Sequence, residues 1–129
     1  MRTRIKFCGL TRPGDVRLAI ELGVDAIGFI FARQSKRKLD EEQIEGLRQA
    51  CSPLVSVIAL FMDNTGVEVS SAIRALSPNF LQFHGAENDS VPDICAGTDS
   101  AATSATTGTP GFITPSSAAA SSPVQTVAR

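Results

Sequence analysis

Four apolar runs that alternate with helical patterns constrain the fold of this 129-residue chain more than any other feature. The runs read as strands because they are short and bounded by glycine, charged residues or polar loops. Helices of about ten residues are expected between them, since apolar residues there recur three and four positions apart. A βαβαβαβ order predicts a parallel sheet with right-handed crossovers. Both a doubly wound sheet and half of a (β/α)₈ barrel fit this order. The expected strands are 4–8, 25–31, 54–61 and 79–84, and the expected helices are 13–22, 40–50 and 67–76.

The first run, Arg4–Cys8, predicts a short buried strand that ends in a thiol. Side chains alternate along a strand, so Lys6 and Cys8 should point to the same face. Gly9 allows a tight turn directly after Cys8. Chemistry in α/β proteins gathers where the strands end, and a nearby cation or helix N-terminus favours a thiolate. Cys8 is therefore a candidate for chemistry, although a small cysteine also packs well in a core.

Polar residues follow two later strands at the same expected edge of the sheet. The loop after Phe31 contains four basic residues, among them Arg37, which could grip a carboxylate or phosphate with its planar fork. A solvated surface loop is the alternative for such a run. Gln82 and His84 share one face of the fourth strand, and polar groups that point inward need partners. A purely structural histidine is the alternative there.

Charge and cysteine content exclude several classes of function. The net charge of −1 provides no electrostatic basis for binding nucleic acid or an anionic membrane surface. No apolar run approaches the ~18 residues of a membrane span, and the start lacks the apolar core of a signal peptide, so we expect a cytoplasmic protein. Three widely spaced cysteines predict reduced thiols, and no paired CxxC suggests zinc.

The composition changes near residue 90. From Ala96 onward the chain is mostly Ala, Gly, Ser, Thr and Pro, with Asp99 and Arg129 its charged residues. Such a segment buries too little apolar surface to offset its conformational entropy. We therefore expect a folded domain over 1–89 and a mostly disordered tail over 90–129. One hypothesis is that a frameshift or mispredicted end follows residue 88; the nucleotide sequence there would test it.

Four motifs in order resemble the phosphoribosylanthranilate isomerase family of tryptophan biosynthesis over residues 4 to about 87. These motifs are KFCGLT at 6–11, GFIF at 28–31 followed by SKR at 35–37, VIALF at 57–61, and LQFHG at 81–85. The family is a (β/α)₈ barrel, so the resemblance implies its N-terminal half. It also implies an enzyme that needs no cofactor or metal and that converts phosphoribosylanthranilate to 1-(2-carboxyphenylamino)-1-deoxyribulose 5-phosphate, an Amadori rearrangement.

The resemblance also implies roles for individual residues. Cys8 would be the general base, and Arg37 would bind the anthranilate carboxylate. Gln82 and His84 would line the barrel floor near the small-molecule substrate, and Lys6 joins them as a substrate-binding residue. The family's general acid, an aspartate after the sixth strand, and its phosphate-binding loops have no counterpart here. We therefore expect negligible activity from this chain alone.

Two other functions remain open at this stage. A non-catalytic half-barrel would expose its sheet edges and could form a homodimer or bind a partner through them. A doubly wound binding or phospho-relay domain is less well supported. It would need an acidic cluster after the first strand, where this chain has Cys8 and Gly9.

Overall fold

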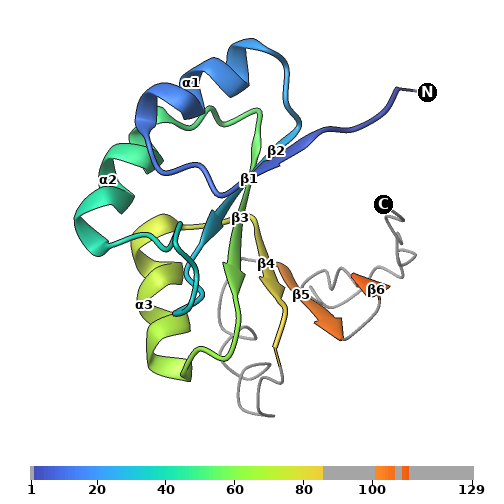
Figure 1. The fold of residues 1–129 in the computed structure, drawn as a ribbon. Coiled ribbons are helices and arrows are strands. Elements are labelled where there is room, and N and C mark those ends of the chain that lie inside the picture. The colour runs from blue at the N-terminus through green and yellow to red at the C-terminus, as the bar shows by residue number, and fades with distance from the viewer. Residues whose placement is uncertain (1, 86–100, 107–108, 111–129) are drawn as a thin grey trace, which may run out of the picture.

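The computed structural model describes residues 2–85, 101–106 and 109–110, and in residues 2–85 strands and helices alternate as the sequence predicts (Figure 1). All four predicted strands and all three predicted helices are confirmed, with ends that shift by a few residues. No helix in this described part is long and apolar enough to cross a membrane. The elements are β1 (Lys6–Cys8), α1 (Pro13–Glu21), β2 (Ala26–Ile30), α2 (Glu41–Ala50), β3 (Ser56–Phe61), α3 (Gly66–Leu76), β4 (Phe80–Phe83), β5 (Ala101–Thr106) and β6 (Thr109–Pro110).

The strands lie in the order of the sequence, β1-β2-β3-β4-β5-β6. Pairing is parallel from β1 to β5 and antiparallel between β5 and β6. The helices α1, α2 and α3 all lie on one side of the sheet (Figure 1). A doubly wound sheet reverses its strand order and carries helices on both faces. The observed order is therefore that of half a (β/α)₈ barrel, and the doubly wound alternative is wrong.

The strand β5 lies within the segment whose composition predicted disorder. Its residues pair in register with β4, from Phe80 with Ala101 to Phe83 with Ser104. The composition did not predict this strand, because an Ala/Ser/Thr run has no apolar alternation that would indicate one. Most of the expected tail, including 90–100 and 111–129, lies outside the described residues. The domain boundary near residue 89 and the disorder beyond it stay predictions.

The hydrophobic core lies between the sheet and its three helices. Alternate strand residues, such as Ile27 and Phe29 on β2, point toward the helices and are fully buried. They pack with Val16, Leu47 and Val69, one from each helix. Because side chains alternate along a strand, the other residues of each strand form the opposite, inner face of the sheet.

Three phenylalanines form a continuous stack at the ends of neighbouring strands. The ring of Phe61 lies 5.5 Å from the rings of both Phe31 and Phe83, with interplanar angles of 21° and 25°. All three side chains are buried. Aromatic pairs at this separation add to the stability gained from burial alone. The stack thereby links β2, β3 and β4 just below the edge where these strands end.

The strand β1 differs from its prediction as a buried strand. Ile5, which precedes β1, and Phe7 are 46% and 41% exposed, whereas Ile27, which pairs with Phe7 on β2, is fully buried. Within the described part of the chain, β1 is the edge strand and pairs with β2 alone. An edge strand lacks one neighbour, so its apolar side chains remain partly accessible.

Helices α2 and α3 begin with capping boxes. The side chain of Gln43 accepts a hydrogen bond from the backbone N–H of Asp40 at 3.0 Å, and Asp40 is the N-cap residue of α2. At α3, Thr65 Oγ1 accepts from the N–H of Glu68 at 3.4 Å, while Glu68 accepts from the N–H of Thr65 at 2.8 Å. These contacts fix where each helix starts relative to the preceding strand.

Replacing Phe61 with alanine should destabilise the fold strongly. The substitution removes the middle ring of the stack and leaves a cavity, so we expect a loss of ~3–5 kcal/mol in unfolding free energy. Leu54→Ala is the control, because Leu54 is 92% exposed and its removal should change the unfolding free energy by less than ~0.5 kcal/mol. Denaturant unfolding followed by circular dichroism measures both. Equal losses for the two variants would contradict the observed core.

Candidate active site

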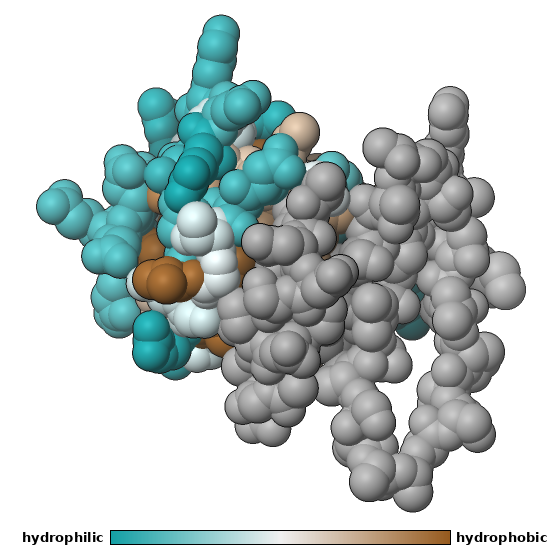
Figure 2. All heavy atoms as spheres, turned by 90° about the horizontal axis from the view of Figure 1, so that it is seen from below, coloured by the Kyte–Doolittle hydropathy of each residue, from teal (hydrophilic) through white to brown (hydrophobic). Residues whose placement is uncertain are grey.

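Parallel strands end at a common edge, where the loops that follow β1, β2 and β3 meet the two described residues after β4. Seen from below the view of Figure 1, the described surface is mainly hydrophilic, with a few apolar side chains between the polar ones (Figure 2). This is the edge on which (β/α)₈ barrels place their active sites. Four of the five residues singled out from the sequence contact one another here or just below it on the inner face.

Cys8 is the last residue of β1 and is exposed. Its sulfur faces β2, since a Cβ built on Gly28 would lie 2.7 Å from Cys8 Sγ and 3.1 Å from Lys6 Cε. The prediction that Lys6 and Cys8 share one strand face is therefore confirmed. The chain turns at Gly9, whose φ of +80° is a conformation that side chains other than glycine rarely adopt.

Arg37 reaches Cys8 across the sheet edge. Its Nη1 donates a hydrogen bond to the backbone carbonyl of Cys8 at 3.3 Å. The guanidinium lies against Gly9, where an added Cβ would come within 2.8 Å of Nη1. Gly9 is thus required both by its backbone conformation and by this close approach. The structure places the candidate base and the candidate anion-binding residue side by side.

Lys6 and Gln82 meet on the inner face of the sheet. Lys6 Nζ donates to Gln82 Oε1 at 2.6 Å, although 76 positions separate the two residues. Gln82 is buried, with 7% of its surface exposed, and so has the partner that an inward-pointing amide needs. Burial lowers the pKa of the Lys6 ammonium from its usual 10.5, while the nearby Cys8 acts in the opposite direction.

His84 follows β4 directly and belongs to the same edge. Its backbone N–H donates to the carbonyl of Phe61 at 3.0 Å, and its side chain is exposed. Within the described residues, no side-chain hydrogen bond joins His84 to Lys6, Cys8, Arg37 or Gln82. The structure therefore gives His84 the expected location at this edge without a side-chain hydrogen bond to the other candidates.

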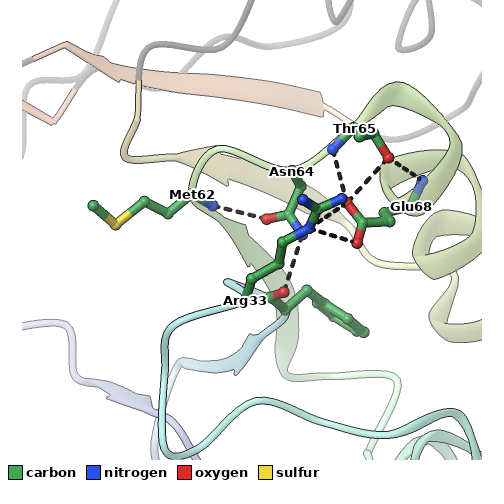
Figure 3. Close-up of polar contacts among 6 residues, drawn as sticks. Arg33, Met62, Asn64, Thr65 and Glu68 are labelled. Carbon is green, nitrogen blue, oxygen red and sulfur yellow. Dashed lines mark hydrogen bonds and ion pairs between the residues drawn. The ribbon is translucent and has the colours of Figure 1, made fainter.

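A buried asparagine joins the loops after β2 and β3, and the sequence reasoning did not assign it to the site. Asn64 Nδ2 donates to the carbonyl of Phe31 at 3.1 Å, and Asn64 Oδ1 accepts from the N–H of Met62 at 3.0 Å (Figure 3). The residue is only 6% exposed. Such a buried amide is stable only when both of its ends are paired, as they are here. Asn64 thus fixes the start of the loop that carries Arg37.

An ion pair reinforces the same connection. Arg33 Nε donates to both carboxylate oxygens of Glu68, at 2.9 and 3.2 Å, and thereby ties this loop to the first turn of α3 (Figure 3). Arg33 and the N–H of Thr65 lower the pKa of Glu68 to about 2. The Thr65-x-x-Glu68 pattern is the sequence signal of a capping box and marks the start of a helix. It carries no information about the contact with Arg33.

A cavity of about 320 Å³ opens between these two loops, beside the Arg33–Glu68 pair. It contains none of the five residues singled out from the sequence. No group of three or more His, Cys, Asp or Glu side chains in the described part of the chain could hold a metal ion. The residues lining the cavity are Ala32, Arg33, Gln34, Ser35, Met62 and Asp63.

A parallel sheet whose strands follow the order of the sequence, with its helices on one face, defines the N-terminal half of a (β/α)₈ barrel. Residues 5–105 match the family model "N-(5'-phosphoribosyl)anthranilate (PRA) isomerase". The chain belongs to this family. The match extends beyond residue 87, where the sequence resemblance was expected to end, and includes most of β5.

Similar proteins support the same family and show how much of it this chain spans. The N-(5'-phosphoribosyl)anthranilate isomerase of Stenotrophomonas maltophilia is 57% identical over 89 residues, which are 69% of this chain and 41% of that protein. The Xylella fastidiosa protein of the same name is 53% identical over 88 residues, 68% of this chain and 40% of its own length. The chain thus spans about two fifths of these curated relatives.

Solved structures agree on the fold. The phosphoribosyl anthranilate isomerase of Thermus thermophilus superposes with a TM-score of 0.64 at 32% identity, over 71% of this chain and 46% of that one. The Thermotoga maritima enzyme has a TM-score of 0.68 at 26% identity, over 75% and 48%. A further isomerase structure is a complex with reduced 1-(o-carboxyphenylamino)-1-deoxyribulose 5-phosphate.

The Arg33–Glu68 contact should make the free energy of unfolding depend on pH in the acidic range. The folded-state pKa of Glu68, about 2, lies below its usual 4.5, so the carboxylate stabilises the fold above pH 4.5. This contribution should disappear as the pH falls from 4.5 to about 2. At neutral pH, Glu68→Gln should cost ~0.5–1 kcal/mol, a modest value because the Arg33 and Glu68 side chains are 53% and 35% exposed.

Glu42→Gln is the matched control, because Glu42 also lies in the first turn of a helix but forms no ion pair with an arginine of the described residues. Urea unfolding at a series of pH values compares the two variants with the parent. A Glu68→Gln difference that persists unchanged at pH 2 would contradict the assignment.

Proposed function

We propose that this chain supplies the N-terminal half of an N-(5'-phosphoribosyl)anthranilate isomerase and contributes its general base. The single observation that carries the proposal is the hydrogen bond from Arg37 to the backbone carbonyl of Cys8, which brings a guanidinium to the residue that carries the candidate base. A base next to an anion-binding group suits a substrate that carries a carboxylate close to its reacting carbon. Family membership and the names of the relatives support the same reaction.

The reaction moves a proton and leaves the atom count of the substrate unchanged. A general acid protonates the ring oxygen of the ribose, which opens the ring to a Schiff base. Cys8, as thiolate, then takes the proton from C2', and the electrons of that C–H bond neutralise the iminium. The resulting enol-amine tautomerises to the ketose. A base of this kind contributes roughly 10²–10⁴-fold to the rate when correctly placed.

Arg37 would bind the anthranilate carboxylate through its planar fork. Paired N–H donors fix both the position and the orientation of a carboxylate, which a lysine does less well. Lys6, Gln82 and His84 would line the floor of the site. The cytoplasmic location and a reaction without a cofactor stay predictions.

The general acid and the phosphate site are expected on strands and loops beyond the described residues. By resemblance the acid follows the sixth strand, and phosphate binds near the seventh and eighth. We therefore expect the 129-residue chain alone to have negligible activity. Loss of the general acid alone should lower the reaction rate roughly 10²–10⁴-fold.

A chimeric barrel tests whether Cys8 is the base. Residues 2–85 would be joined to the C-terminal half of the Stenotrophomonas maltophilia relative, which is 57% identical in the matched region. The chimera should turn over phosphoribosylanthranilate, measured as loss of anthranilate fluorescence. Cys8→Ser should lower kcat by roughly 10²-fold or more, because a hydroxyl is a much weaker base than a thiolate.

Cys51→Ser is the matched control in the same chimera. Cys51 lies at the end of α2, where its thiol donates to the carbonyl of Leu47 at 3.2 Å, and its loss should leave kcat within about twofold. A folded chimera without turnover, or an active Cys8→Ser variant, would contradict the proposed function. Normal turnover by the 129-residue chain alone would overturn the expectation that it is inactive.

A second candidate function is a half-barrel that pairs with another copy through β1. The observation that favours it is the exposure of Ile5 and Phe7, 46% and 41%, on the strand that pairs only with β2 in the described part. Exposed apolar edge strands favour association. One related solved structure is of monomers generated from the dimeric isomerase of Thermotoga maritima.

Sedimentation velocity over a range of concentrations tests this second function. The parent should sediment as a dimer, and Phe7→Glu should shift it toward the monomer because the charge opposes burial of the edge. Leu54→Glu, an equal change at a residue that is 92% exposed, is the control and should leave the dimer intact. A parent that is monomeric at every concentration would exclude this candidate.

A further inference from the structure

The side chain of Lys6 crosses the inner face of the sheet. Lys6 lies on β1 and Gln82 on β4, with β2 and β3 between them. The 2.6 Å hydrogen bond from Lys6 Nζ to Gln82 Oε1 therefore spans two intervening strands. The lysine stem passes beside Gly28 of β2, where a Cβ would come within 3.1 Å of Lys6 Cε. The lysine thus links the strand that carries Cys8 to the far side of the half-barrel.

Gly28 makes this crossing possible. A Cβ at Gly28 would lie 2.7 Å from Cys8 Sγ and 2.8 Å from Leu60 Cδ1, in addition to its contact with Lys6. Real Cβ atoms essentially never approach other heavy atoms so closely, so three side chains converge on space that only glycine leaves free. The thiol of Cys8 and the stem of Lys6 are consequently close neighbours.

Among the described strand residues on the inner face, Cys8 is the ionisable group that accompanies Lys6. Gln82 is neutral, and the described strand residues of this face on β2 and β3 are glycine, apolar residues and serine. The described strand residues that ionise on this face are Lys6 and Cys8. Arg37 adds a second cation at the Cys8 carbonyl, and Asp63 and His84 lie in the loops at the sheet edge. A half-buried ammonium therefore lies beside a thiol, with no carboxylate hydrogen-bonded to it in the described part.

We propose that Lys6 is a positioning residue for Cys8: Gln82 holds its ammonium in place on the inner face, where it favours the thiolate and limits the positions open to the sulfur. This inference rests on the proposed role of Cys8 as the base and assigns Lys6 a task beyond contact with substrate. A cation beside a cysteine is a general means of raising thiolate reactivity. The amide supplies the acceptor that keeps the flexible lysine from turning toward solvent.

The test measures the rate at which iodoacetamide alkylates Cys8 in the full 129-residue chain near neutral pH, resolved by mass spectrometry of peptides. Lys6→Met removes the charge at similar length and should slow alkylation of Cys8 roughly 3- to 10-fold. Gln82→Met keeps the shape of the amide but removes the acceptor, and it should also slow the reaction about threefold. Lys6→Arg keeps the cation and should restore the rate to within about twofold of the parent.

Cys51 provides an internal control in every variant, because its thiol is half-buried and burial raises its pKa. The alkylation rate of Cys51 should stay constant in every variant. An increase would show that the variant has lost its fold. If Gln82→Met unfolds in this way, Gln82→Leu replaces it. Parent-like Cys8 reactivity in folded Lys6→Met or Gln82→Met overturns the inference, as does failure of Lys6→Arg to restore it. No substrate is involved, so this result is independent of whether the chimeric barrel is active.

Discussion

The packing of three helices against one face of a parallel sheet is the constraint on which the rest of this structure depends. It commits alternate residues of each strand, such as Phe29, Phe61 and Leu81, to a closed apolar layer. Burial of this layer is the main force that holds the strands together. Side-chain alternation then assigns the remaining residues to the inner face. Gln82 lies on that face because its neighbours Leu81 and Phe83 belong to the core, and Lys6 and Cys8 lie there because they alternate with Phe7 along β1.

Small and polar residues adapt this scaffold for chemistry. Gly28 leaves space on the inner face, and Gly9 lets the guanidinium of Arg37 approach the backbone at the end of β1. The loop that carries Arg37 is itself held at its start, where Asn64 binds the carbonyl of Phe31. A side chain on a well-anchored loop keeps its position more closely than one on a free loop. The site is therefore prepared by contacts that lie outside it.

Individual residues show which features of the site the sequence predicts and which it does not. Alternation correctly placed Lys6 and Cys8 on one face, and the glycine after Cys8 correctly predicted a turn. Resemblance to a family selected Arg37, whereas spacing alone left it as a surface residue. No local sequence pattern could predict the hydrogen bond from Lys6 to Gln82, because 76 positions separate the two residues. The exposure of Ile5 and Phe7 was also missed, since an apolar run carries no mark of an edge strand.

The sequence by itself determined the kind, order and approximate ends of the first seven elements. Hydrophobic period, capping residues and turn residues act within a few positions, so their effects are legible along the chain. Only the tertiary structure decided which strands are neighbours, which of them lies at an edge, and which side chains meet across the sheet. Those features depend on how separate elements pack, and the packing energy is shared among residues far apart in sequence. The meeting of Cys8, Lys6, Arg37 and Gln82 is therefore a property of the fold.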